Sequence, residues 1–129
     1  MKKIILALSL FAATVFAHEG EHGPSTVQAP KGGVMRSLET VHLELVNERK
    51  KVKIYVYDIK VKPADVAQYA VSATVTLPKK KPETIKLVEA GDHWEADIDS
   101  KNSHRYTLIL DIKQGGHEDK IKWVVEPKK

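Results

Sequence analysis

The chain has 129 residues and a mass of 14.4 kDa, a length typical of a single domain. It contains no cysteine, which excludes disulfides, thiolate metal sites, cysteine nucleophiles and a lipoprotein anchor. The net charge is +4, and without Lys2 and Lys3 only 19 basic residues face 17 acidic ones. That excess is too small to indicate nucleic acid or an anionic membrane as a partner.

The first 17 residues have the three parts of a secretory signal peptide. Lys2 and Lys3 give a cationic start, residues 4–16 are almost wholly apolar, and Ala17 ends the run. The apolar stretch is too short for a transmembrane helix, which needs about 17–25 apolar residues. We therefore expect cleavage after Ala17, a mature chain that begins at His18 without a transmembrane segment, and a periplasmic or secreted location.

Residues 18–31 are rich in Gly, Pro, Ser and Gln and show no apolar periodicity. This composition predicts a flexible or loosely docked leader that contains histidine. We expect the folded domain to comprise residues 32–129.

Apolar residues recur at every second position through the rest of the chain. Such alternation predicts antiparallel strands with one face in the core and the other in water. The predicted strands cover residues 41–46, 52–57, 71–77, 93–98, 105–112 and 120–125, with short ones around 85–87 and 34–38. Seven or eight short strands favour an all-β fold, an immunoglobulin-like antiparallel β-sandwich, with a small barrel as the alternative.

The six histidines are the most informative residues for chemistry, since no catalytic triad or phosphate-binding motif is present. His18 and His22 lie with two glutamates within five residues, and imidazole favours Cu, Ni or Zn. A solvated polar leader without a ligand role is the alternative interpretation.

Cleavage after Ala17 strengthens the case for a metal. The new α-amino group of His18, with an ordinary pKa of about 7.7–8.0, can chelate Cu(II) together with the Nδ1 atom of the same residue. This arrangement resembles the histidine brace of periplasmic copper-carrier proteins, which are exported β-sandwiches that begin at His. The partner imidazole stays unassigned among His22, His42, His93 and His104.

Two further pairs, His42 with Glu44 and His93 with Glu95, each place an imidazole and a carboxylate on one face of a strand. If these two strands were neighbours, four ligands would share one wet face. The alternative is that these are ordinary outward-facing polar residues. We expect His104 at the margin of the core and His117 in an exposed turn.

A family resemblance appears in the first half of the chain. It rests on His22-Gly23-Pro24, on Gly32-Gly33, on the strand Val41-His42-Leu43-Glu44-Leu45-Val46, and on Lys53-Ile54-Tyr55-Val56-Tyr57-Asp58. These residues resemble a small periplasmic β module that occurs alone and near the front of adaptor subunits of heavy-metal efflux systems. The resemblance implies metal handling, with His22, His42 and Glu44 at the matching positions, whereas Lys31 stands where that module often has His.

We therefore expect a non-catalytic periplasmic protein that carries or buffers copper, as Cu(II) or Cu(I), or Zn(II), in metal homeostasis or efflux. Its expected partners are the metal ion and a membrane efflux component, and its expected ligands are His18, His22, His42 and Glu44. Met35 offers a thioether to Cu(I), although a lone Met on a strand is usually a core residue.

Two alternatives remain. The first is a non-metal immunoglobulin-like interaction module that docks a membrane or periplasmic partner by strand addition or through Tyr55 and Tyr57. The second, a copper oxygenase at the terminal histidine, has no identifiable second functional group.

Overall fold

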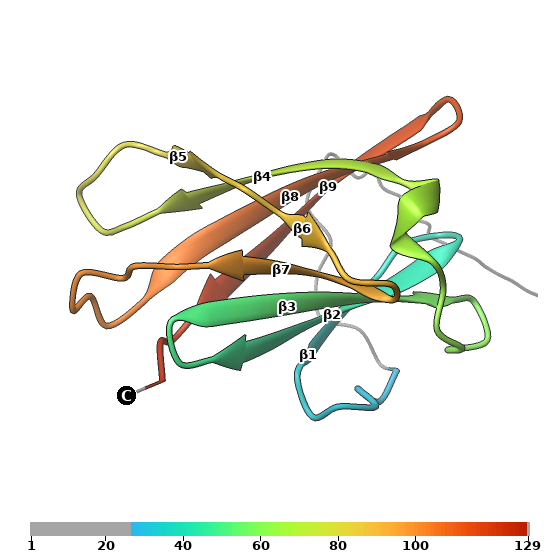
Figure 1. The fold of residues 1–129 in the computed structure, drawn as a ribbon, viewed down its shortest axis with the longest axis horizontal. Helices are drawn as coiled ribbons and strands as arrows, with labels where there is room; N and C mark the ends of the chain where they lie inside the picture. The colour runs from blue at the N-terminus through green and yellow to red at the C-terminus, as the bar shows by residue number, and fades with distance from the viewer. Residues whose placement is uncertain (1–26, 129) are drawn as a thin grey trace, which may run out of the picture.

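A computed structural model describes residues 27–128, and this part of the chain is an all-β fold of two antiparallel sheets (Figure 1). Its elements are β1 (Val34–Ser37), β2 (Val41–Glu48), β3 (Lys51–Asp58), the 3-10 helix η1 (Val66–Gln68), β4 (Ala70–Thr76), β5 (Glu83–Ile85), β6 (Val88–Glu89), β7 (His93–Asp97), β8 (Tyr106–Gln114) and β9 (His117–Val125). The five-stranded sheet has the order β1-β2-β3-β7-β6, and the four-stranded sheet has the order β5-β4-β8-β9. No helix within residues 27–128 is long and apolar enough to cross a membrane. The predicted signal peptide lies outside the described residues.

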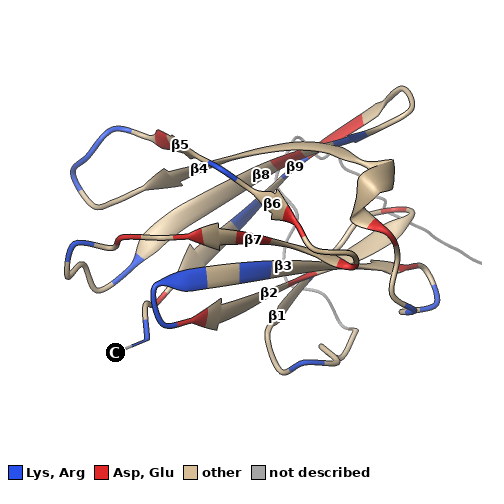
Figure 2. Ribbon diagram, viewed as in Figure 1, with Lys and Arg blue, Asp and Glu red and all other residues tan. Residues whose placement is uncertain are grey.

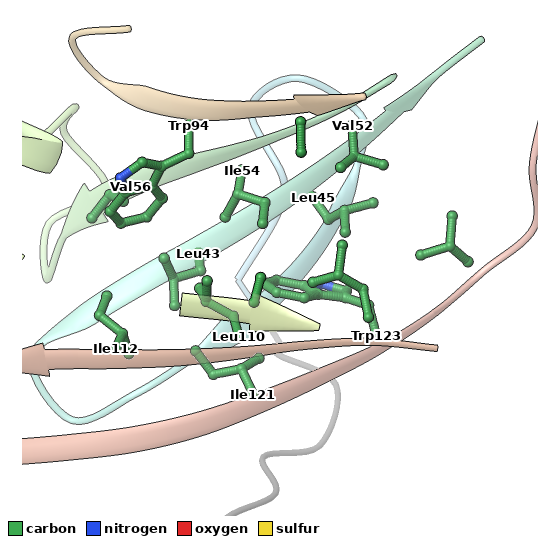
Figure 3. Packing of buried hydrophobic residues seen from close by; sticks show 14 of the residues in the cluster. Leu43, Leu45, Val52, Ile54, Val56, Trp94, Leu110, Ile112, Ile121 and Trp123 are labelled. Atoms are coloured by element: carbon green, nitrogen blue, oxygen red, sulfur yellow. The ribbon is translucent and has the colours of Figure 1, made fainter. Parts of the chain in front are cut away.

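The alternating residues of the long strands fill the space between the two sheets, as their period of two predicts. Trp94 from β7 and Trp123 from β9 are each 1% exposed and lie among aliphatic side chains from both sheets (Figure 3). Burying one such aliphatic side chain contributes about 1.5–3 kcal/mol. A core of this kind needs no disulfide to hold the sheets together.

The short strand predicted around residues 85–87 is in fact two strands, one in each sheet. β5 pairs with β4, whereas β6 pairs with β7, so Lys86 and Leu87 carry the chain from one sheet to the other. Ile85 and Leu87 both pack against the core, because the segment runs along the flank of the sandwich between the sheets. The alternation of apolar residues therefore continues where the chain changes sheet, so the sequence gives no sign of the change.

Side chains link the two sheets along the opposite flank, where β1 and β9 are the edge strands. The indole Nε1 of Trp123 donates a hydrogen bond of 3.1 Å to the carbonyl oxygen of Val34. The Nε of Arg36 donates one of 3.1 Å to the carbonyl oxygen of Lys122. An edge strand with open backbone groups can pair with another chain, and these two contacts occupy carbonyls that would otherwise be available.

Candidate functional site

The predicted ligands of β2 lie on the outer face of the five-stranded sheet. Val41, Leu43 and Leu45 point into the core, so His42 and Glu44 point away from it. The expectation that this face is wet is wrong at these two positions, since His42 is 6% exposed and Glu44 is 0% exposed. Burial of a carboxylate requires hydrogen-bond partners.

The carboxylate of Glu44 finds these partners in the chain that precedes β1 and on β3. The backbone N–H of Gly33 donates to Oε2 at 2.7 Å, and the backbone N–H of Lys31 donates to the same oxygen at 3.0 Å. The hydroxyl of Tyr57 donates to Oε1 at 2.6 Å. Glu44 therefore anchors the last residues of the predicted leader, and it would have to give up these bonds to coordinate a metal.

Gly33 is required at this anchor because the chain passes too close to β2 for any side chain. A Cβ atom at this position would overlap the carbonyl oxygen of Leu45 and would lie 3.0 Å from the Cγ of Glu44. The preceding residue, Gly32, has a positive φ of 75°, a conformation that favours glycine, and its N–H donates to the carbonyl oxygen of Ala29. The Gly-Gly pair thus permits the tight turn that carries two N–H groups to Glu44.

His42 and Met35 belong to the same outer face but not to the main hydrophobic cluster. The Nδ1 of His42 lies 2.7 Å from the Oγ of Ser37, so Nε2 is the nitrogen that is directed away from that contact and can serve a ligand. Met35 on β1 pairs with Glu44, and Ser37 pairs with His42, which makes Met35 a diagonal neighbour of His42. Met35 is only 5% exposed without being part of the core between the sheets.

Tyr57 is the fourth buried residue on this face, after Glu44, His42 and Met35. It pairs directly with His42 across β2 and β3 and is 3% exposed. Burial and the hydrogen bond to Glu44 raise the pKa of its phenol far above the ordinary value, so the hydroxyl stays protonated and remains a donor. The suggestion that Tyr57 forms an accessible interaction surface is therefore wrong.

The second predicted pair, His93 with Glu95, lies on β7 and is separated from β2 by β3. The Nδ1 of His93 lies 2.8 Å from Oδ1 of Asp92, and the Nε2 of His93 lies 3.0 Å from Oε2 of Glu95. Only the imidazolium form offers two N–H donors to these two carboxylates. The hydrogen bond from His93 is the largest cause that lowers the pKa of Glu95, and the hydrogen bond from Lys51 is the second. Both ring nitrogens are thus occupied, and the four residues of the two pairs do not form one ligand set.

Tyr55 connects the two groups across the sheet. It pairs with Glu44 on one side and with His93 on the other, and its ring centroid lies 4.5 Å from that of His93. The Nζ of Lys31 lies 4.7 Å from the Tyr55 ring centroid, a cation–π distance. Lys31, at the position where the resembling module often has His, therefore contacts the sheet through both its backbone and its side chain.

The two remaining histidines of the described residues, His104 and His117, are both exposed. His117 is exposed as expected, but it is the first residue of β9 and not part of the preceding turn. The prediction that His104 lies at the core margin is wrong. β8 begins two residues after His104, so the inward alternation does not extend to it. Neither residue joins the outer-face group.

Within residues 27–128, no group of three or more His, Asp or Glu side chains could hold a metal ion. The other two predicted ligands, His18 and His22, lie outside the described residues. Neither a protein-family model nor a curated protein sequence matches the chain. The residues of this face and the histidines that precede it in the sequence are therefore the candidate functional residues.

Proposed function

We propose that this protein is an exported periplasmic carrier or buffer for copper or zinc, acting in metal homeostasis or efflux. In this proposal His42 is the ligand from the sheet, and His18 and His22 are the ligands from the leader. The observation that carries it is a buried imidazole outside the hydrophobic core, two residues along β2 from the carboxylate that holds the turn between the leader and the sheet.

The anchor at Glu44 makes this ligand set reachable. It fixes Lys31 over the sheet, and His22 precedes Lys31 by nine residues. An extended chain of that length spans about 30 Å, whereas neighbouring strands are only about 4.8 Å apart. Glu44 then acts as a positioning residue that brings the leader to His42 rather than as a ligand.

Met35 favours copper over zinc in this proposal. Diagonal neighbours across two strands have Cβ atoms within about 7–8 Å, a distance that long side chains bridge. A thioether beside an imidazole suits Cu(I), and the amine and imidazole of a terminal His18 suit Cu(II). The recipient we propose is a membrane efflux component.

We also infer an immunoglobulin-like topology for the sandwich. The order β2-β3-β7-β6 corresponds to strands A-B-E-D of that fold, and β5-β4-β8-β9 corresponds to C′-C-F-G. β1 is then an added strand before A. In this assignment the proposed metal ligand His42 lies on the outer face of the A-B-E-D sheet.

The test is a competition titration of the exported protein with Cu(I), Cu(II) and Zn(II), after its intact mass has established that it begins at His18. His42→Ala and the double variant His18→Ala/His22→Ala should each lower the affinity for at least one of these ions by more than tenfold. His104→Ala is the matched control, because it removes an exposed imidazole elsewhere on the domain, and it should leave the affinity unchanged.

Equal affinities in the His42→Ala and His104→Ala variants would refute the assignment of His42. Absence of binding by the unaltered protein would refute the carrier proposal as a whole. Capture of a membrane partner by that metal-free protein would favour the interaction module instead.

A further inference from the structure

The charged loop residues are segregated between the two ends of the sandwich (Figure 2). Because the strands are antiparallel, residues 48–51, 77–83, 97–105 and 126–128 all lie at one end. These segments, which we call the basic end, hold nine Lys or Arg and five Asp or Glu residues. The segments at the other end, residues 38–40, 58–65, 89–93 and 114–118, hold two Lys or Arg and six Asp or Glu residues.

Most cations of the basic end have no acidic partner among residues 27–128. Lys51 forms an ion pair of 3.2 Å with Glu95, but the other eight Lys and Arg residues make no ion pair with a described residue and are exposed. They include Arg49 and Lys50 in the β2–β3 hairpin and three consecutive lysines at 79–81. These charges are therefore directed to solvent rather than used within the fold.

Three of the four segments of the basic end, the hairpin, the β7–β8 loop and the C-terminal segment, line a hollow of about 1060 Å³. The N–H of Ile98 donates to the carbonyl oxygen of Lys50 at 3.0 Å, which joins the β7–β8 loop to the hairpin. The side chain of Asn47 donates to the carbonyl oxygen of Glu126 at 2.6 Å, which joins the C-terminal segment to β2. The cations of these three segments are consequently presented by hydrogen-bonded backbone rather than by a loose tail.

We propose that the basic end docks onto the surface of an anionic phospholipid bilayer. Seven of its nine cations are lysine, whose ammonium is a hydrated point charge that suits the diffuse negative charge of an anionic bilayer and needs no bidentate geometry. A protein interface also needs apolar or aromatic anchors. The exposed large apolar residues of the described chain, which are Val34, Ile59, Val88 and Val124, all lie outside these loop segments.

Because basic and acidic loop residues lie at opposite ends of the domain, the small net charge of the chain does not reveal the basic end. Each Lys or Arg near an anionic membrane strengthens binding by about fivefold, and the attraction decays within a Debye length of about 8–10 Å. The two ends are separated by the length of β9, about 30 Å for nine residues. The acidic end therefore lies beyond the reach of the membrane field when the basic end is docked.

The experiment measures co-sedimentation of the purified protein with vesicles of phosphatidylcholine containing 30% phosphatidylglycerol, in the presence of a metal chelator. Arg49→Glu/Lys80→Glu reverses two exposed charges at the basic end. Lys60→Glu/Lys62→Glu is the matched control, because it reverses two exposed charges at the acidic end and gives the same net charge. Circular dichroism of both variants checks that they fold.

We expect the unaltered protein to bind these vesicles in low salt, to release them in high salt, and to ignore pure phosphatidylcholine. The basic-end variant should bind at least 30-fold more weakly, and the control should lose much less. Equal loss in both variants would overturn the proposal, because net charge alone would then explain binding. Binding to the acidic polymer polyglutamate but not to anionic vesicles would also overturn it in favour of an acidic protein partner.

Discussion

Replacing Glu44 with glutamine tests whether this carboxylate holds the leader on the sheet. The two side chains have nearly the same shape, but the amide replaces one acceptor oxygen with an NH₂ group. If the remaining side-chain oxygen still accepts the hydrogen bond from the Tyr57 hydroxyl, the N–H of Gly33 faces the new NH₂ group, which is also a donor. Since a hydrogen bond to a charged group contributes about 1.5–3 kcal/mol, we expect the free energy of unfolding to fall by about 2–4 kcal/mol.

Urea unfolding followed by tryptophan fluorescence measures this loss, and hydrogen exchange at the amide of Gly33 reports on the anchor itself. Glu95→Gln is the control, because that carboxylate also accepts hydrogen bonds but is part-exposed, and its replacement should cost much less stability. A loss below about 1 kcal/mol for Glu44→Gln, with unchanged exchange at Gly33, would refute the anchoring role.

Three further predictions concern other parts of the domain. Gly33→Ala should displace the turn from β2 and lower the free energy of unfolding by about 1–3 kcal/mol in urea; an unchanged midpoint would show that the turn is free to move. Trp94 and Trp123 are each 1% exposed, but within the described structure Nε1 of Trp94 has no hydrogen-bond partner whereas that of Trp123 has one. Replacement by Phe should therefore cost about 1–2 kcal/mol more at Trp123 than at Trp94, and equal losses would contradict this account. The pKa of Glu95 is lowered chiefly by the hydrogen bond from His93. The stability that this hydrogen bond contributes is therefore present above the unfolded-state pKa of Glu95, and it is lost as the pH falls through the lower folded-state pKa. In an NMR titration, His93→Phe should raise the Glu95 pKa toward its ordinary value, and an unchanged pKa would identify a different cause.

The inner faces of the strands follow from the sequence because a strand has a period of two. Val52, Ile54 and Val56 are all buried as their alternation predicts. The partner of each strand does not follow, because any amphipathic strand can pair with any other of similar length. This is why the sheet change at Lys86 and Leu87 is invisible in the sequence.

The candidate site was only partly predictable for a different reason. The pair His42 and Glu44 could be recognised from residue type and spacing, but the burial of Glu44 could not, because the segment that binds it has no apolar pattern and binds through backbone N–H groups. Every residue except proline carries such a group, so residue type gives no signal. The adjacent glycines at 32 and 33 were the available hint, since neighbouring glycines permit close approach of two backbones.

The side-chain links between β1 and β9 have a consequence for how this protein behaves at high concentration. An incoming strand at that flank would have to displace the guanidinium of Arg36 and the indole of Trp123 from the carbonyls they already occupy. At the other flank the outermost strands, β5 and β6, have only three and two residues, so few backbone groups are available to form hydrogen bonds with a second copy. Edge-to-edge polymerisation is thereby hindered on both sides, by occupied acceptors on one and by brevity on the other.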